Sequence, residues 1–139
     1  MKINHAAVRV PDFDAAVAWY AEKLDFRLSQ AVPVGDLTFG LLYVAGDDSF
    51  HFELQAGPGA ESRPAYKDLH GSYEMSGWHH VGFQVDRVDD VIDELKRRSV
   101  TIISEPHDVP SMQLRVAFFA DPWGNLFEVI HQLNVSSES

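Results

Sequence analysis

The apolar and polar residues of the first half of the chain alternate in some stretches and recur at helical spacing in others. Between residues 3 and 10, alternate side chains point to opposite sides of an extended chain, which is the pattern of a half-buried strand. Pro11 ends this strand and Asp12 is a suitable helix N-cap, after which apolar residues recur at helical spacing to about Lys23. The pattern predicts a strand followed by an amphipathic helix.

Three further strands complete the first half. They are expected at residues 26–32, 37–44 and 50–55, where apolar residues are bounded by the turn-forming segments 33–36 and 46–48. The predicted order of elements is therefore βαβββ.

The second half repeats the first with an offset of 75 residues. Over about fifty positions the apolar residues coincide, for example Val8 with Phe83, Val10 with Val85, Val17 with Ile92, Leu28 with Ile103 and Phe52 with Phe127. The repeat predicts a strand at residues 80–85, a helix capped by Asp86, and strands at residues 101–104, 114–119 and 126–131. A type I turn at residues 121–124 would join the last two strands.

The expected organisation is one α+β domain built from two paired βαβββ modules. The modules are residues 1–56 and 78–133, and their sheets are expected to pair as a cupped mixed sheet around a metal site. Residues 57–77 have no counterpart in the repeat, so they are predicted to form a connector with a helical turn around residues 65–69, either as a surface linker or as a lid. Residues 134–139 are expected to form a frayed tail.

The amino-acid composition limits the possible metal ligands and binding partners of the chain. The chain has 139 residues, of which 45% are apolar and 23% charged, as in ordinary globular proteins. It contains no cysteine, so a metal ion would have to be held by histidine and carboxylate. A net charge of −10 opposes binding to nucleic acid or to anionic membranes, and no apolar run is long enough for a membrane span. A cytoplasmic location is expected.

Four residues form the candidate metal site. His5 and Glu53 are separated by 48 residues, and His80 and Glu128 repeat both the spacing and the strand positions. Two imidazoles and two carboxylates suit a divalent ion such as Zn, Ni, Co, Mn or Fe, with room left for water or substrate. The duplication favours metal binding over a structural role for each residue.

Several neighbours of these four residues are candidates for substrate contact. His51 and Gln55 share a strand face with Glu53, and Gln84 shares a face with His80. Arg9 lies on the same face as His5, where it would either clamp a substrate carboxylate or form a salt bridge with an acidic residue.

The remaining histidines are expected in structural positions, with lining of the cavity as the alternative for His131. His79 is expected on the side opposite His80, packed or hydrogen-bonded beside Trp78, and His70 and His107 are expected in loops.

Three segments resemble the vicinal oxygen chelate superfamily, which includes glyoxalase I, bleomycin resistance proteins and extradiol dioxygenases. They are His5-Ala6-Ala7-Val8-Arg9-Val10-Pro11-Asp12, His80-Val81-Gly82-Phe83-Gln84-Val85 and Asp121-Pro122-Trp123-Gly124-Asn125-Leu126-Phe127-Glu128. The resemblance covers residues 3 to 132 and implies paired βαβββ modules, a homodimer, and a metal ion that chelates two neighbouring oxygens of a small substrate.

Within that superfamily the resemblance to glyoxalase I is greatest, because its four ligand positions match His5, Glu53, His80 and Glu128. The resemblance implies a lyase or isomerase that abstracts a proton next to a carbonyl and passes through an enediolate, with Glu128 as the base and Glu53 able to substitute. Arg9 falls where glyoxalase I binds a glutathione carboxylate. The alternatives are an extradiol-type dioxygenase, a methylmalonyl-CoA epimerase, and a drug-binding protein of the bleomycin resistance type.

Overall fold

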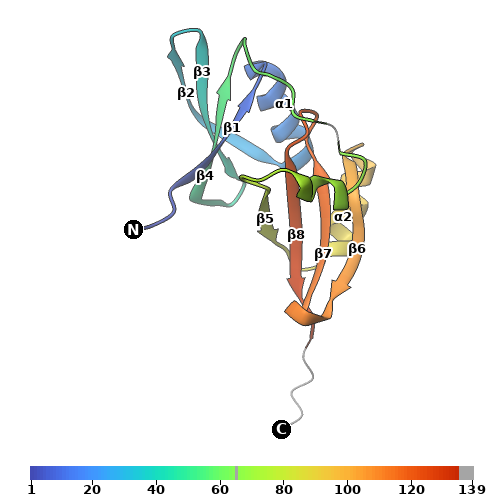
Figure 1. The fold of residues 1–139 in the computed structure, drawn as a ribbon. Helices are drawn as coiled ribbons and strands as arrows, with labels where there is room; N and C mark the ends of the chain where they lie inside the picture. Colours follow the sequence, from blue (N-terminus) through green and yellow to red (C-terminus); the bar gives the residue numbers. More distant parts are fainter. Residues whose placement is uncertain (65, 135–139) are drawn as a thin grey trace. The chain divides into compact units, whose positions relative to one another are not determined.

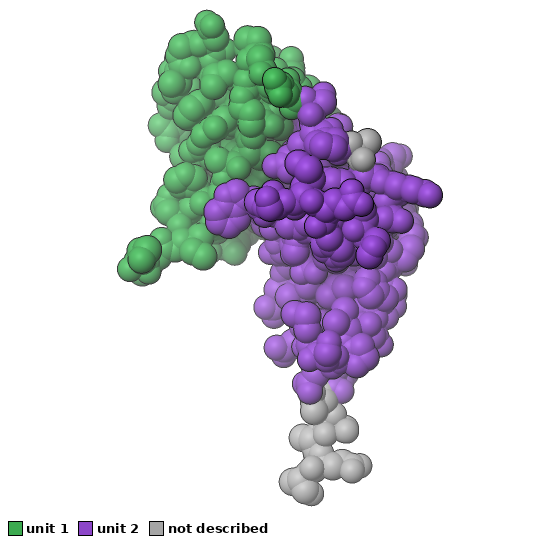
Figure 2. Space-filling model, viewed as in Figure 1, with its two compact units in different colours: residues 1–61 green, residues 62–139 purple. Residues whose placement is uncertain are grey.

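The computed structural model describes residues 1–64 and 66–134. It divides into two compact units, Met1–Glu61 and Ser62–Ser139, which Figure 2 colours separately. Of the predicted tail, residues 135–139 lie outside the described residues. Neither α-helix is long and apolar enough to cross a membrane, among the residues described.

Unit 1 is a βαβββ module (Figure 1). Its elements are β1 (His5–Val10), α1 (Phe13–Leu24), β2 (Phe26–Val34), β3 (Leu37–Val44) and β4 (Asp47–Ala56). The strand order is β1-β4-β3-β2, in which β1 is parallel to β4 and the other pairs are antiparallel. The predicted order of elements is confirmed.

Two turns of unit 1 are tighter than predicted. Strand β2 continues through Pro33 to Val34 and β4 begins at Asp47, so the turns are confined to residues 35–36 and 45–46. Gly35 and Gly46 adopt φ values of 62° and 89°, which only glycine adopts without steric cost. A glycine in each turn therefore allows the chain to reverse direction within two residues, so the flanking strands are longer than predicted.

The core of unit 1 forms between α1 and one face of the sheet. Tyr20 is fully buried and packs against Phe26 and Phe52, with ring centroids 5.6 and 5.3 Å away. Phe52 and Leu54 of β4 are both buried, so the alternation of the strand turns Glu53 to the opposite face of the sheet. Helix packing thus decides which residues of β4 remain available for a site.

Asp12 caps helix α1 as predicted. Its carboxylate accepts a hydrogen bond from the Ala15 N–H at 2.7 Å, which satisfies one of the free donors of the first turn.

Asp12→Ala is expected to lower the free energy of unfolding by about 1 kcal/mol, because the cap bond is lost. Asp86→Ala is the matched control, since Asp86 makes no cap bond to the second helix. Urea unfolding of both variants measures the difference. Equal destabilisation by the two substitutions would contradict the assignment of the cap to Asp12.

Unit 2 repeats the module after a short 3-10 helix, η1 (His70–Glu74). Its further elements are β5 (His80–Gln84), α2 (Val88–Arg97), β6 (Thr101–Val109), the 3-10 helix η2 (Pro110–Met112), β7 (Leu114–Ala120) and β8 (Leu126–Gln132). The strand order β5-β8-β7-β6, with β5 parallel to β8, matches that of unit 1. The helical turn expected around residues 65–69 is displaced to η1, and residue 65 lies outside the described residues.

The turn at residues 121–124 is present and is held by a buried carboxylate. The Gly124 N–H donates to the Asp121 carbonyl at 3.2 Å, and Asp121 Oδ1 accepts from the backbone N–H groups of Trp123 and Asn125. Asp121 is one of two buried polar residues of the described chain, and these bonds satisfy it.

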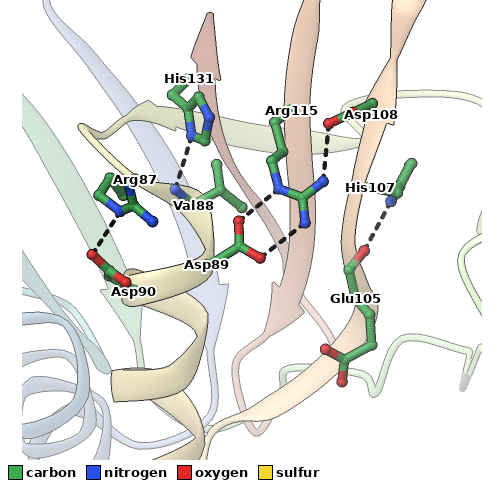
Figure 3. A network of polar contacts seen from close by, with 9 residues as sticks. All are labelled: Arg87, Val88, Asp89, Asp90, Glu105, His107, Asp108, Arg115 and His131. Atoms are coloured by element: carbon green, nitrogen blue, oxygen red, sulfur yellow. Dashed lines mark hydrogen bonds and ion pairs between the residues drawn. The ribbon is translucent and has the colours of Figure 1, made fainter. Parts of the chain in front are cut away.

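The prediction that Asp86 caps helix α2 is wrong. The N-cap position is Arg87, one residue later, and the Val88 N–H donates instead to Nδ1 of His131 at 2.9 Å (Figure 3). A side chain from β8 therefore replaces a local cap, so the start of α2 is set by the sheet beneath it.

Arg115 of β7 holds the start of α2 to the sheet. Its guanidinium donates to both carboxylate oxygens of Asp89, at 2.6 and 2.8 Å, and to Asp108 at 2.9 Å (Figure 3). The hydrogen bonds from Arg115 lower the pKa of the Asp89 carboxyl.

Arg115→Gln is expected to destabilise the protein at neutral pH and to matter less in acid. The pKa of Asp89 is lower in the folded state than in the unfolded chain. The ion pair therefore contributes fully to the free energy of unfolding above the pKa of an unfolded aspartate, about 4, and this contribution is lost as the pH falls through the folded pKa. Thermal unfolding of wild type and variant from pH 7 to pH 3 measures this. A difference that stays constant with pH would contradict the ion pair.

Candidate metal centre

Unit 1 brings His5 and Glu53 together across two parallel strands. Strands β1 and β4 pair with His5 beside His51 and Ala7 beside Glu53, so both side chains leave the sheet on the same face. His5 Nε2 lies 3.9 Å from Glu53 Oε2. The glutamate side chain is 16% exposed and the histidine 45% exposed, so this pair is open to a ligand.

Both members of the unit 1 pair are oriented by neighbours. Nδ1 of His5 lies 2.8 Å from Oδ1 of Asn4, and Nε2 of Gln55 donates to Oε1 of Glu53 at 2.9 Å. The predicted substrate contact Gln55 is thus bonded to a candidate ligand. These contacts leave His5 Nε2 and Glu53 Oε2 facing each other.

Unit 2 builds the same pair from equivalent strands. His80 lies at the start of β5 and Glu128 in β8, with His80 Nε2 3.7 Å from Glu128 Oε1. A small residue stands opposite each glutamate, Ala7 in unit 1 and Gly82 in unit 2. A Cβ added at Gly82 would lie 3.5 Å from the Glu128 carboxylate, an ordinary van der Waals contact, so an alanine would fit there as Ala7 does in unit 1.

The carboxyl of Glu128 is partly buried. Burial raises its pKa above the usual range, while the charges of His80 and His107 act in the opposite direction. A carboxyl whose pKa is shifted toward neutrality is better suited to take up and return a proton.

His107 is a site neighbour that the sequence analysis placed in a loop. It lies in β6, which continues to Val109 because the strand resumes after an irregularity between Ser104 and His107. Pro106 lies in this irregular stretch, as is usual for proline in a strand, which occurs at edges and bulges. The strand brings His107 within electrostatic reach of Glu128.

His79 does not point away from His80 as predicted. Strand β5 begins at His80, so the alternation of a strand does not apply to the preceding residue. Nδ1 of His79 lies 2.8 Å from Nδ1 of His80, and its Nε2 lies 2.8 Å from the Ser72 hydroxyl. Burial lowers the pKa of His79, and the neighbouring His80 lowers it further.

Arg9 is held by the backbone. Its Nη1 donates to the carbonyls of Val10, Gln55 and Gly57 at 2.6 to 3.0 Å, and its Nη2 donates to that of Pro58 at 2.7 Å. The guanidinium thereby ties the start of the connector to the ends of β1 and β4. This differs from the predicted salt bridge, and the predicted role of Arg9 toward a substrate carboxylate stays a prediction.

The two other predicted substrate contacts lie on the strands that carry the pairs. His51 stands next to His5 in the β1–β4 register, and Gln84 is exposed at the end of β5. Their roles toward a substrate stay predictions.

The donor atoms of each pair fit a divalent ion. Two ligand atoms bonded to one ion at about 2.0 to 2.2 Å stand about 3.4 Å apart in tetrahedral geometry. The His–Glu separations of 3.9 and 3.7 Å are near that value and too long for hydrogen bonds. Within the described residues, no three His, Asp or Glu side chains gather closely enough to hold an ion. Each unit therefore supplies two candidate ligands, and the joint site of four stays a prediction.

Comparison with known proteins agrees with the fold. The chain is 30% identical over 132 residues to the uncharacterised protein YurT of Bacillus subtilis, covering 95% of this chain and all of that protein. It is 29% identical over 104 residues to human mitochondrial methylmalonyl-CoA epimerase, covering 75% of this chain and 57% of the epimerase. The crystal structure of glyoxalase I from Zea mays superposes with a TM-score of 0.75 at 24% identity, covering 96% of this chain and 46% of that one.

The family assignment rests on most of the chain. The sequence profile of one superfamily matches residues 2–129, which include the first βαβββ module, the second as far as the middle of β8, and all four candidate ligands. The chain belongs to the Glyoxalase/Bleomycin resistance protein/Dioxygenase superfamily.

Proposed function

We propose that this protein is a metal-dependent lyase or isomerase of the glyoxalase I type, acting on a small substrate with vicinal oxygens. The observation that carries the proposal is the duplicated pair, in which a histidine Nε2 faces a glutamate oxygen on the same strands of both units. A structural ion pair has no need to be repeated at identical spacing on an open face of each sheet.

Four side chains would hold the ion. They are His5 and Glu53 from unit 1 and His80 and Glu128 from unit 2, brought together within one chain or across a homodimer. Imidazole nitrogen with carboxylate oxygen suits Zn, Ni, Co, Mn or Fe. Such an ion, when bound, supplies Lewis-acid polarisation of the substrate oxygens.

Glu128 is proposed to move the proton between adjacent carbons of the substrate. In the metal-free protein, burial raises the pKa of this carboxyl, which favours uptake of a proton. Glu53 is the second candidate for this role, and Gln55 fixes the orientation of its carboxylate. His51 and Gln84 are proposed to contact the substrate around the two pairs.

Epimerisation is the second candidate reaction. It is favoured by the 29% identity to human methylmalonyl-CoA epimerase over 75% of this chain. An epimerase also removes a proton next to a carbonyl, but it returns the proton to the same carbon from the other side. The residues proposed above would serve either reaction. The two reactions are therefore distinguished by which substrate the protein turns over.

The test is an assay of the metal-loaded protein on both substrates. Isomerisation of the methylglyoxal–glutathione hemithioacetal, lost in Glu128→Gln and Glu53→Gln, would support the glyoxalase-type proposal. Epimerisation of methylmalonyl-CoA without hemithioacetal turnover would assign the second candidate. Turnover of neither substrate by fully loaded protein would overturn both.

A further inference from the structure

Ser72 is a buried polar residue in the connector that the proposed chemistry leaves unused. It is 1% exposed and lies in η1, where its hydroxyl donates to the Leu69 carbonyl and also contacts Nε2 of His79 at 2.8 Å. His79 in turn contacts His80, a candidate ligand, through the two Nδ1 atoms at 2.8 Å. A chain of hydrogen bonds therefore links the connector to the candidate metal site within unit 2.

The donor and the acceptor of each hydrogen bond in this series can be assigned from the Ser72 hydroxyl. A serine hydroxyl has one hydrogen, and since it is donated to the Leu69 carbonyl, the contact with His79 requires His79 to donate from Nε2. Nδ1 of neutral His79 then carries no hydrogen and accepts from Nδ1–H of His80. His80 is left with a bare Nε2 lone pair, the atom that faces Glu128.

Unit 1 reaches the same arrangement by a shorter route. Asn4 occupies the position equivalent to His79 at the 75-residue offset, directly before the candidate ligand. Its Oδ1, a carbonyl oxygen that can only accept, lies 2.8 Å from Nδ1 of His5. His5 also keeps a bare Nε2, which faces Glu53.

We propose that Asn4 and the Ser72–His79 pair are positioning residues that hold His5 and His80 in the Nδ1–H tautomer, leaving each Nε2 free to bind metal. The tautomer of a ring is set by the hydrogen bond that its other nitrogen makes, and such partners strengthen metal binding by histidine. The part concerning metal rests on the proposed function, whereas the tautomer is a property of the metal-free protein.

The test is long-range ¹H–¹⁵N NMR of the histidine rings in metal-free protein, at a pH where both rings are neutral. Wild type is expected to show protonated Nδ1 and bare Nε2 for both His5 and His80. His79→Leu removes the acceptor and should move His80 toward the Nε2–H form, which predominates in water. His79→Asn copies unit 1 and should retain the wild-type pattern. His131, whose Nδ1 accepts from the Val88 N–H within unit 2, is the internal control for folding in both variants.

Three further variants complete the design. Ser72→Ala should weaken the preference of His80 for the Nδ1–H tautomer, because His79 loses the partner that fixes its own tautomer. Ser72→Thr keeps the hydroxyl and should retain the wild-type preference of His80. Asn4→Leu should move His5 and leave His80 unchanged.

Zn²⁺ affinity provides the second measurement. It is expected to fall about 10- to 100-fold in His79→Leu and to stay within a few-fold of wild type in His79→Asn. His80 in the Nε2–H form in wild type, or a tautomer unaffected by His79→Leu, would overturn the proposal. The expected tautomers in a protein that binds no metal would leave the positioning role intact and refute the proposed function instead.

Discussion

Glu128→Gln is expected to lower kcat/KM by about 10² to 10⁴-fold, the contribution typical of a positioned general acid or base. Glutamine keeps the size of the side chain but cannot take up the proton. Steady-state assay of metal-loaded protein measures the loss, and metal content must be measured in parallel because the same side chain is a candidate ligand.

Glu128→Asp serves as the control that keeps a carboxylate. It should retain more activity than Glu128→Gln if the proton is carried by this group. Full activity of Glu128→Gln at full metal occupancy would assign the proton transfer to Glu53 or to another residue.

Glu128→Gln should also stabilise the metal-free protein at neutral pH. Burial raises the pKa of Glu128, so the folded protein binds this proton more tightly than the unfolded chain, and stability is lost as the pH rises from the unfolded pKa through the folded one. Glutamine has no charge to bury. The gain should therefore disappear below the usual pKa of glutamate, about 4.3.

Removal of the metal is expected to have the second large effect, on thermal stability. An ion that binds only the folded state stabilises it by about 4 kcal/mol when its free concentration exceeds Kd by about a thousandfold. Dialysis against a chelator should lower the Tm of wild type, and Zn²⁺ should restore it.

His5→Ala and His80→Ala should each abolish this response, since each removes one imidazole from a different unit. His70→Ala is the matched control, because His70 lies in η1 and is exposed. A Tm that responds to metal equally in all three variants would contradict the assigned ligands.

The sequence predicted most of the elements because their causes are local or periodic. Burial of Phe52 and Leu54 against α1 fixes the face of β4, and the alternation of that strand then places Glu53 on the other face. The repeat extended the same reasoning to Glu128. The candidate ligands within each unit could therefore be paired correctly without coordinates.

The contacts that were missed join residues far apart in the sequence. His131 replaces Asp86 as the partner of helix α2 across 43 positions, and Arg9 bonds to carbonyls up to 49 positions away. Ser72 lies in a connector with no equivalent in the first half, so the repeat could not assign it a role. Such partners cannot be predicted from a local sequence pattern, because they depend on the three-dimensional arrangement of the strands and the connector.

The two pairs are proposed to hold one ion together. The most direct measurement is metal per chain, determined by elemental analysis of protein purified without added metal, for wild type, His5→Ala and His80→Ala. Close to one ion per chain is expected in wild type and little in either variant. Two ions per chain, or loss in only one variant, would show that the pairs act separately, and a metal-free wild type that also fails to take up added Zn²⁺ would contradict the claim.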